Sequence, residues 1–430
     1  MTVAARETVL ITALDAAGRG VGRGQEDPAA QRWRAPGALP GEIIEVEAAA
    51  PAAKPSAPRV AERWRLLEPA PERVAPPCAH AGLCGACSLQ HAALGFTAAW
   101  KRGRIERALA AAGLEAPVAE TRVSPLSSRR RVKLAAHRGK KGVRLGYFER
   151  GAHRVAPIES CLIAHPAISA ALPALRDLAA LAAPRARPIA LWVEATEGGL
   201  DVMAEAAKPL DLPLREQGAA WAEDADVARL SWNGETLAAR RPALRRHGSA
   251  LVAAPAGAFR QATEAGETAL VAIARRALTG ARRVADLFAG AGTFALPLAE
   301  EAEVLAVEGD SALVSALDRA WRETPGLKRL EAVRRDLFRR PLLPEELASV
   351  DGAVFDPPRA GAEAQTEALA AAPPSLGRIV GVSCEPESFA RDAAILARGG
   401  WRLAEVTPID QFLFSAHVEL IGVFERRSEP

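Results

Sequence analysis

An apolar strand that runs into a glycine loop constrains the fold of this 430-residue chain more than any other feature. The strand covers 283–288, Gly290 and Gly292 follow it, and a helical pattern begins directly after them. Helix and strand signals then alternate along the chain, with helices over 264–278, 294–301 and 311–321 and further strands over 304–308, 352–355 and 378–383. Because such alternation is typical of strands joined by covering helices, it predicts an α/β fold with a parallel sheet between two layers of helices.

The N-terminal part has a different pattern. A strand-like segment at 9–11, a glycine-punctuated stretch at 14–24 and an alternating strand at 42–46 predict a small β-barrel. The segment 48–58 is rich in Ala and Pro, and we interpret it as a loop or linker.

Between these parts, a helical pattern at 92–112 precedes short strands, such as 142–148 and 189–194, and Ala-rich helices. Since domains usually span roughly 100–200 residues, the chain length suits two or three of them. We expect domains over 1–65, 66–255 and 256–430, and the helix near 92–115 could pack on the last of these.

Composition excludes an integral membrane protein, because charged residues interrupt every long apolar stretch before the roughly 20 residues that a membrane helix needs. Glu7 stands where a signal peptide would have its basic end, so we expect a cytoplasmic protein. The net charge is only +3, but the segment 101–154 contains fifteen Lys and Arg against four Asp and Glu. This local excess fits a surface that binds phosphates, and equally a solvated face.

The glycine loop is also a candidate nucleotide site. Glu308 ends the next strand, eighteen residues after Gly290, where an acidic side chain can bind the hydroxyls of an adenosine ribose. NAD and S-adenosylmethionine both suit this arrangement. The third glycine of a dinucleotide site is missing, and Asp356-Pro357-Pro358-Arg359 forms a rigid ledge after a later strand. Both observations favour S-adenosylmethionine.

Cysteines form two further candidate sites. Cys384 follows the apolar strand 379–383, which places its thiol at the same sheet edge as Asp356, so catalysis is favoured over a role as a small buried hydrophobe. Cys78, Cys84 and Cys87 are separated by five and two residues, and Cys161 is the remaining cysteine that could complete a metal site. Spacing alone does not separate zinc from an iron–sulfur cluster.

In combination these motifs resemble the RNA 5-methyluridine methyltransferases of the RumA/RlmD type, which are related to the TrmA enzymes of tRNA. The resemblance covers almost the whole chain, and its N-terminal segment through Pro40-Gly41-Glu42 is similar to the OB-like TRAM barrel of that family. The motifs that carry it are Cys84-Gly85-Ala86-Cys87, Asp286-Leu287-Phe288-Ala289-Gly290-Ala291-Gly292, Asp356-Pro357-Pro358-Arg359, Ser383-Cys384-Glu385-Pro386 and His417-Val418-Glu419.

The resemblance implies a role for each candidate residue. It implies a Rossmann-like methyltransferase domain in which Cys384 is the nucleophile and Glu419 the proton acceptor. The implied S-adenosylmethionine contacts are Gln261, Phe288, Thr293, Glu308, Asp336 and Asp356, and the implied ligands of a [4Fe-4S] cluster are Cys78, Cys84, Cys87 and Cys161. The family commonly has Asn where Thr263 and Glu385 stand here, and Asn or Asp at the position of Asp336.

The implied activity is methylation of carbon 5 of a uridine, with 23S ribosomal RNA as the expected substrate and transfer RNA as the alternative. The target uridine must be single-stranded or flipped out, and the basic residues Arg129, Arg130, Arg131 and Lys133 would grip the backbone. We expect a monomer with a structural cluster. An iron–sulfur oxidoreductase that uses NAD and a non-catalytic RNA-binding protein remain the alternatives from other classes.

Overall fold

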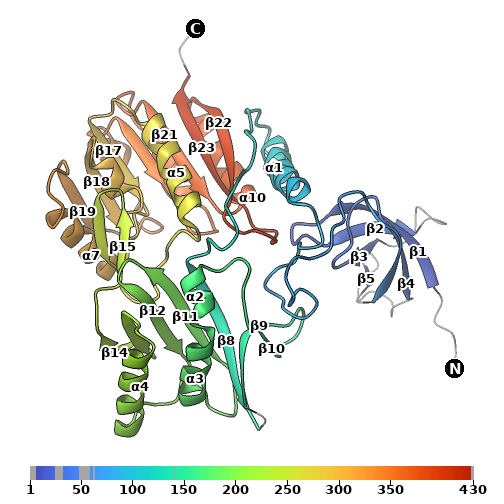
Figure 1. Ribbon diagram of the computed structural model, residues 1–430. Coiled ribbons are helices and arrows are strands. Elements are labelled where there is room, and N and C mark those ends of the chain that lie inside the picture. The colour runs from blue at the N-terminus through green and yellow to red at the C-terminus, as the bar shows by residue number, and fades with distance from the viewer. Residues whose placement is uncertain (1–5, 25–31, 48–58, 62, 141, 428–430) are drawn as a thin grey trace.

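The computed structural model describes residues 6–24, 32–47, 59–61, 63–140 and 142–427. Along these residues the chain forms an N-terminal sheet, a central sheet with its own helices, and a C-terminal sheet covered by helices (Figure 1). No helix in this described part is long and apolar enough to cross a membrane. The segment 48–58, interpreted above as a loop or linker, lies outside the described residues.

The N-terminal strands form a 6-stranded sheet in the order β5-β3-β2-β1-β4-β6. Val9 and Ile11 are buried whereas Leu10 between them is exposed, as expected for a strand with one face on a core. The predicted β-rich N-terminal part is therefore confirmed, while its assignment as a TRAM barrel stays a prediction. The strands are β1 (Arg6–Leu14), β2 (Gly20–Gly24), β3 (Trp33–Ala35), β4 (Ile43–Glu47), β5 (Arg59–Val60) and β6 (Trp64–Glu68).

The central strands form a 7-stranded sheet in the order β10-β9-β8-β11-β12-β13-β14. Leu175 and Leu178 of its helices share a buried cluster with Leu134, Val193 and Trp232 of its strands. The elements are β8 (Arg131–Gly139), β9 (Gly142–Phe148), β10 (Val155–Pro157), α2 (Pro166–Ala170), α3 (Leu172–Ala182), β11 (Ile189–Thr196), β12 (Gly199–Glu205), α4 (Leu212–Asp224), β13 (Arg229–Trp232) and β14 (Glu235–Ala239), followed by the hairpin of β15 (Leu244–His247) and β16 (Ala250–Ala253).

The C-terminal strands form an 8-stranded sheet in the order β19-β18-β17-β20-β21-β23-β22-β7. Its strands are β7 (Arg122–Val123), β17 (Arg283–Leu287), β18 (Glu303–Glu308), β19 (Leu330–Arg334), β20 (Gly352–Phe355), β21 (Arg378–Ser383), β22 (Trp401–Asp410) and β23 (Glu419–Arg426). The helices that connect or cover them are α1 (Leu94–Ala111), α5 (Glu264–Ala277), α6 (Ala295–Leu298), α7 (Ser311–Arg322), α8 (Pro344–Leu347), α9 (Glu363–Ala370) and α10 (Pro386–Arg398).

This sheet differs from the predicted one at its edge. β17, β18, β19, β20 and β21 are parallel as expected, but β23 pairs antiparallel with both β21 and β22. The reason is the connection, because a short loop rather than a helix joins β22 to β23, and a short loop returns the chain in the opposite direction.

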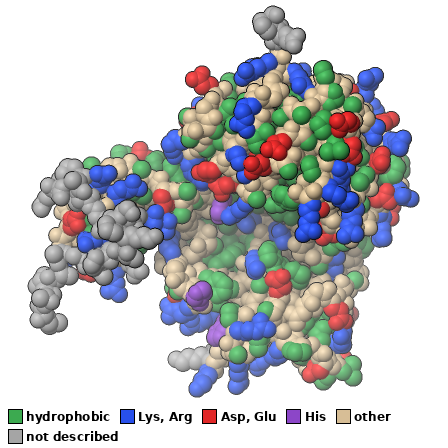
Figure 2. Space-filling view, turned by 180° about the vertical axis from the view of Figure 1, so that it is seen from behind, with side chains coloured by type: hydrophobic (Ala, Val, Ile, Leu, Met, Phe, Trp, Pro, Cys, Tyr) green, Lys and Arg blue, Asp and Glu red, His purple; other side chains and the backbone are tan. Residues whose placement is uncertain are grey.

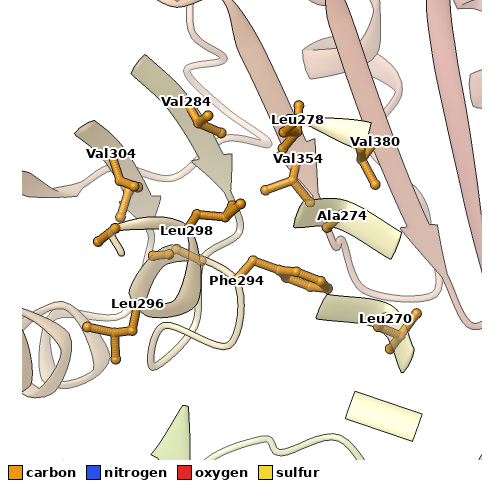
Figure 3. Packing of buried hydrophobic residues seen from close by; sticks show 14 of the residues in the cluster. Leu270, Ala274, Leu278, Val284, Phe294, Leu296, Leu298, Val304, Val354 and Val380 are labelled. Carbon is orange, nitrogen blue, oxygen red and sulfur yellow. The ribbon is translucent and has the colours of Figure 1, made fainter. Parts of the chain in front are cut away.

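Buried clusters on both faces of the C-terminal sheet hold its strands in place. In one cluster the ring of Phe294 points toward Leu270 and Ala274 of α5, and Val304 belongs to the same cluster (Figure 3). The other includes Ile105 and Leu109 of α1, so this helix packs with the C-terminal sheet although it precedes the central one in the sequence. In Figure 1 α1 lies between the N-terminal sheet and β22.

Candidate active site

The strand ends bring the predicted residues to one edge of the C-terminal sheet. Phe288 follows β17, Glu308 ends β18, Asp356 follows β20 and Cys384 follows β21. Glu419 reaches the same edge because β23 is antiparallel to β21, so its first residues lie beside the last residues of that strand. In open α/β sheets this edge is where ligands bind.

A cavity of about 610 Å³ lies at this edge and is lined also by side chains of the central sheet. The volume is within the range of small-molecule sites. One face of the molecule is hollowed between its two larger parts, and Lys and Arg side chains border the hollow (Figure 2). All residues that were predicted for catalysis or cofactor binding line the cavity: Gln261, Phe288, Thr293, Glu308, Asp336, Asp356, Cys384 and Glu419.

The glycine loop is held by Glu308. One carboxylate oxygen of Glu308 accepts from the backbone N–H of Gly290 at 2.9 Å, and the other accepts from Asp310 N–H at 2.9 Å. Gly290 has a φ of 55° and Gly292 a φ of 98°, which favour glycine. A Cβ at Gly292 would also lie 2.5 Å from a methyl carbon of Leu317, so the loop packs tightly on α7.

Two carboxyl groups, those of Asp356 and Glu419, line the cavity. Burial raises the pKa of Asp356 to about 7, although Gln261 Nε2 donates to its Oδ2 at 3.0 Å. Burial also raises the pKa of Glu419 well above its usual value, and the negative charge of Asp356 adds to this shift. Both groups therefore bind a proton more tightly than an exposed carboxylate does.

The thiol of Cys384 is half-buried in the same cavity. Burial and the charge of Glu419 raise its pKa to about 11, whereas the charge of Arg359 and a hydrogen bond from it act in the opposite direction. Arg359 also lies 3.4 Å from Nδ1 of His417. Arg359 and His417 were part of motifs noted in the sequence, but no role was predicted for them, because nothing in the sequence shows that they face Cys384.

The predicted basic stretch divides into two sets. Arg129, Arg131 and Lys133 line the cavity. Cζ of Arg131 lies 4.5 Å and Nζ of Lys133 lies 4.4 Å from the ring centre of Trp192. Arg130 is instead buried and pairs with Glu267 of α5. Arg131 and Lys133 share one face of β8 because side chains alternate along a strand. Arg130 lies before this strand, and its burial makes it unavailable to grip RNA, so that part of the prediction is wrong.

The remaining cysteines meet in a second, small cavity of about 20 Å³. Cys78, Cys84, Cys87 and Cys161 all line it, together with apolar neighbours such as Leu162. Burial raises the pKa of Cys87 to about 11. Within the described residues, no three His, Cys, Asp or Glu side chains are arranged to hold a single metal ion.

The cysteine cavity contacts the loop that joins β22 to β23. Cys87 packs with Leu413 and Phe414 of this loop, and the backbone N–H of Leu89 donates to Phe414 O at 2.8 Å. The same loop contributes Phe412 and His417 to the lining of the larger cavity. One loop therefore packs against the small cavity and lines the larger one, a contact that the sequence did not indicate.

Known proteins resemble this chain over nearly its full length. A family model described as tRNA (Uracil-5-)-methyltransferase matches residues 335–428. A protein of Caulobacter vibrioides named "Uncharacterized RNA methyltransferase" is 42% identical over 98% of this chain and 100% of its own length. The 23S rRNA (uracil(1939)-C(5))-methyltransferase RlmD of Chromohalobacter salexigens is 34% identical over 95% of this chain and 87% of its own length.

Among solved structures, the tRNA (uracil-54, C5)-methyltransferase of Pyrococcus abyssi in complex with S-adenosyl-L-homocysteine has a TM-score of 0.76 to this chain. The two are 22% identical, and the similarity covers 97% of this chain and 99% of the other. At this identity the similarity concerns the fold.

Proposed function

Because the chain belongs to the RNA uracil-5-methyltransferases of the TrmA/RlmD type, which are class I enzymes that use S-adenosylmethionine, we propose that it methylates carbon 5 of one uridine in 23S ribosomal RNA. Membership of this family argues against the two alternative functions considered from the sequence, an iron–sulfur oxidoreductase and a non-catalytic RNA-binding protein. The observation that carries the proposed mechanism is that Cys384 and Glu419 line one cavity with the predicted cofactor contacts. The relative from Chromohalobacter salexigens supports the ribosomal target.

Cys384 acts first in the proposed reaction. Its thiolate adds to carbon 6 of the uracil ring, and the electrons of the C5–C6 double bond move toward carbon 5 and O4. Arg359 supports this step because its charge opposes the effect of burial on the pKa of Cys384. Bound S-adenosylmethionine supplies the methyl group that carbon 5 then accepts.

Glu419 acts after methyl transfer. It accepts the proton that is still on carbon 5, and the electrons of that C–H bond re-form the C5–C6 double bond while the bond from Cys384 to carbon 6 breaks. The raised pKa of Glu419, caused by burial and by Asp356, suits a proton acceptor.

The cavity offers distinct places for cofactor and RNA. We assign Glu308 to the ribose hydroxyls of S-adenosylmethionine, and the basic side chains Arg129, Arg131 and Lys133 to the phosphates around a flipped-out uridine. The other residues that we assign to the cofactor, Gln261, Phe288, Thr293, Asp336 and Asp356, line the same cavity. We place the bonded pair Gln261 and Asp356 where the cofactor and the base meet, so that both side chains can also bind the base.

The small cavity is the proposed site of a [4Fe-4S] cluster held by Cys78, Cys84, Cys87 and Cys161. Its four thiols in apolar surroundings suit this group in number and chemistry. Four sulfur ligands also suit a zinc ion. The metal content of the purified protein decides between the two.

Mapping of 5-methyluridine in ribosomal and transfer RNA from cells that lack the gene tests the substrate. Loss of one 5-methyluridine from 23S ribosomal RNA, restored by the gene but not by its Cys384→Ala variant, is expected. Transfer RNA is the second candidate, because the matching family model is described for tRNA. Loss of the modification from tRNA alone would transfer the proposal to that substrate.

A further inference from the structure

Two glutamine side chains connect the start of α5 with Asp356. The backbone N–H of Thr263 donates to Oε1 of Gln411 at 3.1 Å, and Nε2 of Gln411 donates to Oε1 of Gln261 at 2.7 Å. Nε2 of Gln261 in turn donates to Oδ2 of Asp356 at 3.0 Å. Gln261 and Gln411 are 1% and 2% exposed, so the two bonds of Gln411 are shielded from water, whereas the bond to the half-buried Asp356 lies at the cavity.

The direction of this chain is fixed at its first bond. A backbone N–H can only donate, so it must face the amide oxygen of Gln411. The amide nitrogen of Gln411 is then left for the oxygen of Gln261, which turns the amide nitrogen of Gln261 toward Asp356. Reversing either amide would place two donors or two acceptors against each other in a buried position, which is costly.

The packing of α5 is also adapted to Gln411. A Cβ at Gly266 would lie 2.4 Å from Cγ of Gln411 and 2.7 Å from its Oε1. Gly266 donates its N–H to the hydroxyl of Thr263, the N-cap of this helix, at 3.1 Å. The first turn of α5 therefore supplies both the donor and the space for one orientation of the Gln411 amide.

We propose that Gln411 is a positioning residue that makes the cavity select uracil over cytosine. The inference rests on the proposed function, and Gln411 acts through Gln261 and Asp356, which line the cavity. With its orientation fixed, Gln261 has a second N–H to donate, and Asp356 in its ionised form has an oxygen that can accept. A donor beside an acceptor complements the edge of uracil, where O4 accepts and N3–H donates.

Cytosine presents the opposite polarity on the same edge. Its amino group on carbon 4 donates and its N3 accepts, so it would set two donors and two acceptors against each other in this cavity. A site whose buried polar groups are left unpaired by the wrong substrate discriminates strongly against it. Rotation of the Gln261 amide would remove this discrimination, and Gln411 prevents that rotation.

The test compares kcat/KM for two synthetic RNA oligonucleotides centred on the uridine that the gene deletion leaves unmodified, one with uridine and one with cytidine at that position. In Gln411→Glu the ionised carboxylate still accepts from Thr263 but cannot donate to Gln261, so the Gln261 amide loses the partner that fixes its orientation. We expect the ratio of kcat/KM for uridine to that for cytidine to fall by about tenfold or more. Gly266→Ala displaces Gln411 without removing a polar group, and should lower the ratio in the same direction.

Gln365→Glu is the matched control. Gln365 is 1% exposed and bonds the backbone N–H and C=O of Leu342, away from the cavity, so the same chemical change there should leave the ratio unaltered. Thermal melting identifies any variant that does not fold. If Gln411→Glu does not fold, the kcat/KM ratio of Gly266→Ala tests the role of Gln411 instead. If the unaltered protein does not methylate the uridine oligonucleotide, the proposed function fails. If it does, and the folded variants keep the ratio or lose activity equally on both RNAs, the role of Gln411 is wrong.

Discussion

Cys384 and Glu419 line the same cavity but act on opposite sides of the methyl transfer, so their variants should fail in different ways. With Cys384→Ala no bond to carbon 6 forms, and neither methylated RNA nor a covalent species is expected, although RNA and cofactor still bind. With Glu419→Gln the thiolate adds and the methyl transfers, but elimination stalls. A covalent, methylated RNA adduct that needs S-adenosylmethionine should accumulate and survive denaturing gel electrophoresis. Normal turnover by Glu419→Gln would assign the base to another residue, with Asp356 the next to test.

The environment of Cys384 predicts how its reactivity depends on pH. Burial and Glu419 raise its pKa to about 11, and only the thiolate is alkylated readily, so the alkylation rate should rise about tenfold per pH unit below that value. Arg359→Gln removes a charge that lowers this pKa, and alkylation at a given pH should become slower. Arg391→Gln on α10, whose side chain pairs with Asp392, serves as the control. Peptide mass spectrometry of iodoacetamide-treated protein measures the rates, and alkylation at pH 7 as fast as that of free cysteine would contradict the assignment.

At the scale of elements, the end of β18 organises the loop that follows β17. Glu308→Ala removes the acceptor for two backbone N–H groups and for the expected ribose hydroxyls, so S-adenosylmethionine affinity should fall by roughly 1–3 kcal/mol. Glu303→Ala at the exposed opposite end of the same strand should leave the affinity unchanged. Calorimetric titration with S-adenosylmethionine checks both, and equal affinities in the two variants would show that the cofactor site is misplaced.

The helices and strands also show how much of the fold could be predicted from the sequence. The helices and strands around the glycine loop were predictable within a few residues, because each combines a clear apolar period with a glycine or polar boundary. The hairpin of β22 and β23 was not predicted, since β23 is buried on both faces over its first six residues and β22 alternates only at its start. The chain from Thr263 through Gln411 to Asp356 was equally hidden, because its members come from segments far apart in the sequence and their pairing depends on packing.

At the scale of the whole molecule, the cysteine cavity lies where the distant parts of the chain meet. Cys84 pairs with Glu149 of the central part, and Cys87 packs against Phe414 of the C-terminal part. The sequence suggested a purely structural cluster, because its cysteines lie far from the sheet edge along the chain. Because the cysteine cavity contacts the loop that carries Phe412 and His417, we expect loss of the proposed cluster also to loosen a segment that lines the larger cavity.

Protein purified without oxygen should therefore be brown and contain iron and sulfide in about equal amounts, because four thiolates around one cavity suit a cubane cluster. Cys87→Ser should lower the iron content and also loosen the loop at Phe414, which faster hydrogen exchange at 411–418 would reveal. Cys384→Ser, which changes the cysteine outside this cavity, should retain the full iron content and the slow exchange. Because Cys87→Ser leaves all cofactor contacts in place, S-adenosylmethionine binding should persist while RNA methylation declines. Stoichiometric zinc without iron in the unaltered protein would show that the four cysteines bind zinc. Unchanged hydrogen exchange at 411–418 in Cys87→Ser would show that the cysteine cavity does not stabilise the loop of the larger cavity.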